Sequence, residues 1–456
     1  MKTIGMDIGT TTVCAILADA ETGKLLDVQT LTNDAHLKSE KSWERIQNPK
    51  RILELCRKLL AGYLDKYDDV ESIGVTGAMH GILYTDKEGQ IVSPLYTWQD
   101  QRGDQINPES GKSYAKELSE ITGYAMATGF GLTTHYYNTK HHLIPKEAVS
   151  FCTIPDYVAF SIAQEKEPLL HQSMAASLGI YDIQKGCFDT EAVERAGMDI
   201  EMLPRVTKEN ALCGRTKEGV PVAVSLGDNQ ASFLGSVNEE CKVLLNVGTG
   251  AQLSAYSEKI AEGENLECRP YVGDSWLLAG SALCGGYAYS LMKRFFEETL
   301  ELAETEAKRP IYEILNQAAG AAYEEEKQLT VDTRFNGTRQ NPSITGSVTG
   351  ITVDNFRPGH LALGVLKGIC EELYQHYCTL PDESKGATFF VGSGNGVRMN
   401  PLFQKICCDR FEMNLKIPQY SEEAAYGSGL FALLACGKYQ TLSEVQKLIS
   451  YEQNRE

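Results

Sequence analysis

The chain has 456 residues, of which 42% are hydrophobic and 23% charged, a composition typical of a globular protein with more than one hydrophobic core. Its formal net charge of −18, without a basic run, excludes a nucleic-acid binder, which needs a basic face, and favours a small-molecule ligand. No apolar run is long enough to cross a membrane, and the 13 cysteines include no Cys-x-x-Cys pair, so we expect reduced thiols and a cytoplasmic protein.

The first part of the chain predicts a β-meander, a helix and a further strand. Residues 3–31 alternate between apolar and polar side chains, with a turn signal at 20–23. Apolar residues with helical spacing follow over 48–66, where Asn-Pro forms the cap and first turn, and residues 70–76 have the pattern of a short strand. The glycine-bearing segment Gly77–Gly81 ends that strand.

The second part repeats this plan. A hairpin is expected at 242–256, a helix at 359–377 and a strand at 387–391, which runs into the glycine-rich segment Gly392–Gly396. A duplicated set of hairpin, crossover helix and strand outlines an α/β fold of two actin-like ATPase (ribonuclease H-like) domains with an interdomain cleft.

The boundary between the two predicted domains is placed in the glycine-bearing stretch Leu226–Ser236. The domains are then residues 1–236 and 237–456. Because Gly227 and Gly235 tolerate a wide range of backbone conformations, we expect the hinge of domain closure to lie there.

Two distant turns share one chemistry. Asp7–Thr12 and, in altered form, Asn246–Ala251 each place glycine and hydroxyl side chains between two apolar runs. Such a turn exposes backbone N–H groups and hydroxyls with no large side chain in the way, so it can close around a phosphate. Either turn alone is also an ordinary hairpin turn, whereas the pair predicts two related domains that hold one polyphosphate between them.

Seven short motifs, in family order over essentially the whole chain, together resemble the FGGY carbohydrate kinases. They are Asp7-Ile8-Gly9-Thr10-Thr11, Thr76-Gly77-Ala78-Met79-His80-Gly81, Thr97-Trp98-Gln99-Asp100-Gln101-Arg102, Gly227-Asp228-Asn229-Gln230-Ala231, Asn246-Val247-Gly248-Thr249-Gly250, Arg398-Met399-Asn400-Pro401-Leu402 and Glu422-Glu423-Ala424-Ala425-Tyr426-Gly427. Within the family, residues 98–100 and 122–131 are most similar to the sedoheptulokinases. The resemblance implies transfer of a phosphoryl group from ATP to a sugar hydroxyl, with Mg²⁺ as cofactor.

Phosphoryl transfer to a sugar needs a general base beside the accepting hydroxyl. Asp228 follows the apolar run Val220–Leu226, where a strand end would direct its carboxylate into the cleft, and the resemblance implies that it is this base. An aspartate ahead of Asn229–Leu234 is also suited to cap a helix, and the two roles are compatible.

The resemblance assigns Asp7 to Mg²⁺, through water, because this ion keeps much of its hydration shell. It assigns Thr10 and Thr11, together with Gly248 and Thr249, to the β- and γ-phosphates of ATP. The alternatives are a strand-end carboxylate capped by backbone amides and two ordinary hairpin turns.

The nucleotide is expected at the second glycine-rich segment. Gly392, Gly394 and Asn395 would let ATP lie against the backbone, and the resemblance places adenosine near Asn400, at the start of a helix. Capping of that helix by Asn400 is the alternative.

Two glycines interrupt the helix that is predicted to begin near Glu422. Gly427 and Gly429 each cost up to ~1 kcal/mol in helix propensity relative to alanine, so a specific reason for them is expected. Close packing against the nucleotide pocket and close packing against another helix both explain them.

The sugar site is expected in the first half, after two strands. Carboxylates and amides bind sugar hydroxyls, while an aromatic face covers the C–H side. The predicted substrate-binding residues are Met79, His80, Trp98, Gln99, Asp100, Asp228 and Asn229. For single residues, a satisfied core histidine and a core tryptophan are the alternatives at His80 and Trp98.

Two positions depart from the family pattern. The family often has glutamine where Ala78 stands, which leaves the substrate open. It usually has lysine or arginine shortly after the first phosphate turn, whereas Val13-Cys14-Ala15 has none. Another phosphate contact, weaker ATP binding or a degraded enzyme would each account for this absence.

We therefore expect an enzyme, a carbohydrate kinase that phosphorylates a ketose such as sedoheptulose. The alternatives are a xylulokinase or other pentulose or polyol kinase and, in a different class, a catalytically weak nucleotide- and sugar-binding sensor. Asp228 favours the enzyme, because a sensor needs the phosphate turns but not the base. The expected ligands are a sugar and ATP, without nucleic acid or membrane, in a monomer or homodimer.

Overall fold

The computed structural model describes residues 1–261, 263, 265–338, 341, 343–385 and 388–452, which form two compact units. Unit 1 contains Met1–Asn238, Arg269–Ser275 and Glu422–Ser450, and unit 2 contains Glu239–Cys268, Trp276–Ser421 and the end of the chain from Tyr451. Within these described ranges, no helix is long and apolar enough to cross a membrane.

Unit 1 is built on the strands β1 (Lys2–Ile8), β2 (Thr12–Asp19), β3 (Leu25–Thr32), β5 (Val70–Gly77), β13 (Leu212–Arg215), β14 (Pro221–Ala223) and β15 (Leu226–Gly227). They form a seven-stranded sheet in the order β13-β14-β5-β1-β2-β3, and β15 also pairs with β5. β1 is antiparallel to β2 and parallel to β5, which is in turn parallel to β14 and β15. The predicted meander and the strand that follows it are confirmed.

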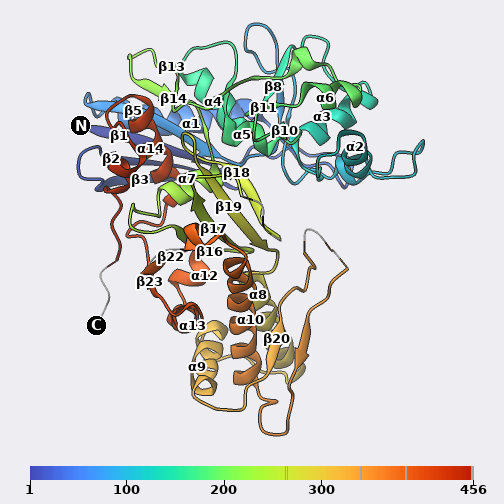
Figure 1. Cartoon of the computed structure of the whole chain (residues 1–456), viewed down its shortest axis with the longest axis vertical. Helices are drawn as coiled ribbons and strands as arrows, with labels where there is room; N and C mark the ends of the chain where they lie inside the picture. Colours follow the sequence, from blue (N-terminus) through green and yellow to red (C-terminus); the bar gives the residue numbers. More distant parts are fainter. Residues whose placement is uncertain (262, 264, 339–340, 342, 386–387, 453–456) are drawn as a thin grey trace. The chain divides into compact units, whose positions relative to one another are not determined.

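Strand β1 is buried on both faces over residues 3–6, which explains its apolar centre from Ile4 to Met6. On one face, Ile4, Met6 and Ile8 belong to the hydrophobic core of unit 1, which also holds the apolar side of helix α1 (Pro49–Leu64). On the other face, Thr3 and Gly5 pack against helix α14 (Glu423–Ala435), which lies over the sheet in Figure 1.

Shorter elements complete unit 1. Its further helices are α2 (Tyr114–Thr122), α3 (Gly131–Lys140), α4 (Ile154–Ile162), α5 (Gln172–Ser177), α6 (Thr190–Arg195), α7 (Asp228–Leu234), α15 (Leu442–Gln446) and the 3-10 turns η1 (Arg102–Asp104) and η2 (Ile200–Met202). Its small sheets pair β4 (Ile46–Gln47) with β7 (Leu95–Tyr96), β6 (Leu83–Thr85) with β8 (Ser150–Cys152), β9 (Leu169–His171) with β12 (Arg205–Thr207) and β10 (Tyr181–Asp182) with β11 (Cys187–Phe188). Asn48 caps α1 and Pro49 opens it, as its sequence predicts.

Unit 2 contains a six-stranded sheet in the order β18-β19-β17-β16-β22-β23. These strands are β16 (Val243–Val247), β17 (Ala251–Ser257), β18 (Glu267–Pro270), β19 (Trp276–Ala282), β22 (Phe389–Ser393) and β23 (Asn414–Lys416), with a separate pair of β20 (Thr330–Asp332) and β21 (Ser347–Thr349). The helices are α8 (Gly286–Leu302), α9 (Ile311–Tyr323), α10 (Pro358–Cys378), α11 (Asp382–Lys385), α12 (Asn395–Arg398) and α13 (Pro401–Phe411).

The two units share one arrangement of strands. β1 is antiparallel to β2 and parallel to β5, and β16 is likewise antiparallel to β17 and parallel to β22. Helix α1 precedes β5, and helix α10 precedes β22. The predicted duplication is confirmed, although β22 runs from Phe389 to Ser393 and residue 387 of the predicted strand lies outside the described residues.

Helix α14 packs against its neighbours backbone to backbone. A Cβ atom on Gly427 would lie 1.8 Å from the carbonyl oxygen of Ala231 in α7, and one on Gly5 would lie 1.8 Å from that of Ala425. Packing against another helix therefore accounts for Gly427. It also places residues 422–450 in unit 1, although they fall in the predicted segment 237–456.

The predicted hinge stretch Leu226–Ser236 is folded and buried. It forms β15 and α7 inside unit 1, and a Cβ on Gly235 would lie 2.0 Å from the carbonyl oxygen of Glu423. This close contact fixes Gly235, whose flexibility the hinge would need. The chain first leaves unit 1 after Asn238.

The substitution Gly427→Ala should destabilise unit 1, because its Cβ has no room unless α14 moves away from α7. We expect a loss of about 1–3 kcal/mol, seen by calorimetry as a lower unfolding temperature. Gly429→Ala is the matched control, since its nearest contact is 3.4 Å away and alanine improves helix propensity. An equal loss in both variants would contradict the packing argument.

Candidate active site

The carboxyl ends of three parallel strands of unit 1 stop at the same level. Ile8 of β1 pairs with Gly77 of β5, and Gly77 pairs with Gly227 of β15. Asp7 and the residues that follow these strands therefore gather at one edge of the sheet. Because ligands of open α/β sheets bind at the carboxyl ends of strands, this edge is the candidate active site of unit 1.

Three carboxylates lie within electrostatic range of one another at this edge. Burial, together with the negative charges of Asp228 and Glu422, raises the pKa of Asp7 to about 7. Burial also raises the pKa of Asp228 to about 6, against the opposing effects of the Asn229 N–H group and Arg269. Glu422, the residue before α14, had no predicted role, because only its motif membership marks it in the sequence.

Asp228 is the first residue of α7, and Gly227 occupies the cap position. The capping role considered for Asp228 is therefore wrong in its simple form. One carboxylate oxygen of Asp228 accepts the backbone N–H of Asn229 at 2.6 Å, which holds the half-buried side chain at the helix start. The positive end of the helix dipole favours the ionised form there.

The turn between β1 and β2 is held by its carbonyl groups. The Asn33 side chain donates to the carbonyl of Gly9, and the Gln47 side chain donates to that of Thr10, both at 2.9 Å. Among the described residues, no acceptor faces the N–H groups of Thr10 and Thr11. The turn therefore presents unused donors, as an anion site requires.

The corresponding turn of unit 2 is anchored in the same way. The carbonyls of Gly248 and Thr249 accept the N–H groups of Gly286 and Tyr287, at the start of α8, at 2.9 Å each. In both turns, backbone carbonyl groups accept hydrogen bonds from the rest of their unit. Thr11 in the first turn and Gly248 and Thr249 in the second are exposed to solvent.

The glycine-rich segment of unit 2 divides into a buried part and an exposed part. Gly392 lies inside β22, packed under Leu415 and Val397, which gives it a packing role, and its contact with ATP stays a prediction. Gly394 has a left-handed φ of 78°, and a Cβ there would lie 2.6 Å from the carbonyl of Val247. Only Asn395 of this segment is fully exposed.

Asn400 caps helix α13, which was the alternative considered for it. Its side-chain oxygen accepts the N–H of Phe403 at 3.1 Å, and its amide donates to Asn316 at 3.2 Å. Only 7% of the surface of Asn400 is exposed, and its side-chain oxygen and amide both form hydrogen bonds within unit 2.

Met79 and Trp98 line a small pocket of about 10 Å³ beside Thr10 and Ala78. Gln47 lines it too, although no sequence pattern marks this residue, which lies on the two-residue strand β4. The pocket has room for about one water, so a sugar would lie outside it. Met79 is buried, whereas Trp98 is 47% exposed.

His80 is held in an unusual conformation at the same edge. It has a left-handed φ of 77°, a strained state for a residue with a side chain. Its Nδ1 lies 2.6 Å from the carbonyl oxygen of Ser177, and its ring stacks on Phe130 at 4.9 Å. The half-buried ring is thus fixed by Ser177 and Phe130, three residues after β5 ends at Gly77.

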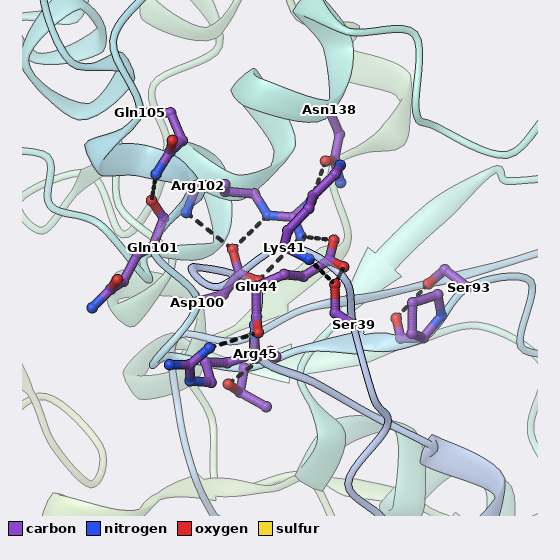
Figure 2. A network of polar contacts seen from close by, with 12 residues as sticks. Ser39, Lys41, Glu44, Arg45, Ser93, Asp100, Gln101, Arg102, Gln105 and Asn138 are labelled. Carbon is purple, nitrogen blue, oxygen red and sulfur yellow. Dashed lines mark hydrogen bonds and ion pairs between the residues drawn. The ribbon is translucent and has the colours of Figure 1, made fainter.

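Asp100 does not fit the role of a sugar ligand. It is fully buried, and its carboxylate accepts the backbone N–H of Arg45 at 2.9 Å and the side chain of Arg102 at 2.6 Å. Figure 2 shows this network, in which Arg102 also reaches Glu44 and Asn138. The sequence indicates Asp100 as a sugar ligand only through its capacity to form hydrogen bonds, whereas in the structure its side chain is buried. The neighbouring Gln99 is exposed.

Models of the N-terminal and C-terminal domains of the FGGY family of carbohydrate kinases match residues 2–235 and 244–436. The chain is 27% identical to a sedoheptulokinase of Mus musculus, over 94% of this chain and 97% of that protein. It is 20% identical to a gluconokinase of Bacillus licheniformis, over 98% of this chain and 90% of that protein. The structure of a xylulose kinase from Rhodospirillum rubrum is similar with a TM-score of 0.85 at 19% identity, covering 99% and 93%.

These similarities confirm the actin-like α/β fold, since the structural likeness extends over nearly the whole of both chains. The matched domains span most of the sequence, and the chain is sedoheptulokinase-like. The chain belongs to the FGGY family of carbohydrate kinases, enzymes that phosphorylate a sugar.

Proposed function

We propose that this kinase transfers the γ-phosphoryl group of ATP to a hydroxyl of a ketose, with sedoheptulose as the first candidate, and that Asp228 is the general base. The observation that carries the proposal is the position of Asp228 at the strand edge, within electrostatic range of Asp7. A pKa of about 6 leaves the Asp228 carboxylate ionised at neutral pH, yet basic enough to receive a proton.

The proposed reaction is an in-line displacement. As the sugar oxygen bonds to the γ-phosphorus, its proton passes to Asp228 and the bond to the bridging oxygen of ADP breaks. The start of α7 holds Asp228 in place through the N–H of Asn229. The proposed sugar contacts are Met79, His80, Trp98, Gln99 and Asn229, with Asp100 as an internal support.

The residues at the edge fit a divalent cation. The pKa of Asp7 is raised partly by neighbouring carboxylates, which marks a concentration of negative charge that a cation would relieve. Within the part of the chain that the structure describes, no cluster of three or more ligating side chains could hold a metal. Asp7 would therefore hold Mg²⁺ through water, and the bound ion would neutralise charge on the phosphates.

The phosphates are proposed to bind the turns of both units, through Thr10 and Thr11 and through Gly248 and Thr249. Among the described residues no acceptor is seen for the N–H groups of Thr10, Thr11 and Thr249, which supports this, whereas the N–H of Gly248 already donates to the carbonyl of Gly250 at 3.0 Å. Gly394 and Asn395 are proposed to contact the nucleotide, with adenosine near Asn400. Residues 1–236 would then supply the sugar site and base, and 237–456 the nucleotide site, in a cytoplasmic monomer or homodimer.

The substrate is the first test of the proposal. We expect the highest kcat/KM with sedoheptulose when ADP release is measured over a panel that includes xylulose, gluconate and glycerol. The similarity to a sedoheptulokinase supports this choice. A preference for xylulose would establish the pentulose kinase instead, and binding of sugar and ATP without turnover would establish the sensor.

Replacement of the proposed base should abolish most turnover. Asp228→Asn keeps the size of the side chain, so kcat should fall by ~10²–10⁴-fold while a non-hydrolysable ATP analogue still binds in calorimetry. Asp156→Asn is the matched control, because Asp156 is also a buried aspartate with a pKa raised to about 6, but it bonds to Thr153 and Ser225. A kcat near the wild-type value in Asp228→Asn would contradict the assignment.

The proposed base also predicts the pH profile. Asp228 must be unprotonated, and its pKa is raised by burial to about 6, so kcat/KM should fall about tenfold per unit below that pH. The same fall in kcat/KM below about pH 6 should appear in Asp156→Asn, and its midpoint should not move with Mg²⁺ concentration. If the pH at which kcat/KM falls shifts with Mg²⁺ concentration, the fall reports the protonation of Asp7. If kcat/KM stays constant down to pH 5, Asp228 is not the general base.

A further inference from the structure

Trp98 and Thr10 come from the two motifs proposed to bind sugar and phosphate, and they touch within unit 1. The indole Nε1–H of Trp98 donates to the Thr10 hydroxyl oxygen at 3.1 Å. An indole N–H can only donate, so the Thr10 oxygen must be the acceptor of this bond. The direction of the contact is therefore fixed by chemistry.

This direction leaves the Thr10 hydroxyl proton without a partner. A hydroxyl has one proton to donate, and among the described residues no acceptor lies within hydrogen-bond distance of it. The Thr10 carbonyl is already used, because it accepts Nε2–H of Gln47 at 2.9 Å. Thr10 therefore still has two donors to offer, its hydroxyl proton and its backbone N–H, and both suit an anionic oxygen.

The Trp98 backbone is held firmly although the side chain is 47% exposed. Its neighbour Thr97 bonds to the carbonyl of Arg45 through its N–H and its hydroxyl, both at 3.0 Å. A Cβ on Gly129 would lie 2.0 Å from the Trp98 carbonyl oxygen, so the turn fits tightly there. The buried pair of Asp100 and Arg102 locks the other side of the turn (Figure 2).

We propose that Trp98 is a positioning residue for phosphate, in addition to its proposed sugar contact. Its N–H bond aims the Thr10 hydroxyl proton at a phosphate oxygen of ATP. A sugar that packs on the ring immobilises the indole and hence Thr10, so the sugar and the nucleotide bind with positive coupling. This inference rests on the proposed role of Thr10 as a phosphate ligand.

The test is a double-mutant cycle on the full chain with Trp98→Phe, Thr10→Val and both together. The readout is the Kd of a non-hydrolysable ATP analogue with Mg²⁺, by calorimetry, with and without sedoheptulose. Trp98→Phe keeps an aromatic face but loses the donor, so we expect Kd to rise about 3- to 10-fold. Thr10→Val should raise it about 10- to 100-fold, and the double variant should match Thr10→Val.

Two further comparisons sharpen the result. Trp276→Phe, on β19 in unit 2, is the control for loss of an indole N–H elsewhere and should leave Kd unchanged. In wild type, sedoheptulose or another accepted sugar should tighten nucleotide binding, and Trp98→Phe should remove most of that gain. Its Michaelis constant for the sugar should change less than its Kd for the nucleotide.

Failure of the inference differs from failure of the proposed function. If Thr10→Val weakens nucleotide binding while Trp98→Phe does not, or if the two effects multiply, Trp98 does not position Thr10 and the inference is overturned. If Thr10→Val leaves Kd unchanged, Thr10 is no phosphate ligand and the proposed phosphate site falls with the inference. Absence of turnover with every sugar would contradict the kinase proposal, whereas the cycle in Kd would still decide the role of Trp98.

Discussion

The contact on which unit 1 depends is the backbone packing of helix α14 against the central strands. Gly5 on β1 and Gly74 on β5 leave no room for a Cβ against α14, and Gly427 on α14 leaves none against α7. Such close packing is possible only with glycine, because any side chain would hold the backbones apart. It brings the end of the chain back onto the first sheet and places Glu422 within electrostatic range of Asp7.

The edge that results is rich in negative charge. Asp7, Asp228 and Glu422 gather there, and the segment Val13-Cys14-Ala15 that follows the first turn has no lysine or arginine. Cys14 on β2 is buried next to Asp7 and Glu422, and burial raises the pKa of its thiol to about 12, so it stays neutral. The positive charge of Arg269 offsets part of this negative charge and lowers the pKa of Asp228. This concentration of carboxylates is consistent with the proposal that a cation binds here with the substrate.

The two turns that are proposed to bind phosphate are anchored in the same way. In each unit the turn is fixed through its carbonyl groups, by Asn33 and Gln47 in one case and by the start of α8 in the other. Among the described residues, this leaves the N–H groups of Thr10 and Thr11 in the first turn and of Thr249 in the second without an acceptor. This arrangement is rigid without filling the space that a phosphate would occupy, which lowers the cost of ordering on binding.

What the sequence by itself determined is local or repeated: the duplicated hairpin, helix and strand, the Asn48 cap and the motifs that identify the family. These follow from side-chain periodicity and turn chemistry over a few residues. Only the tertiary structure decided that Asp100 points inward, that Asn400 caps a helix and that Glu422 joins Asp7. Burial and pKa depend on which distant segments pack together, and no pattern within one segment contains that information.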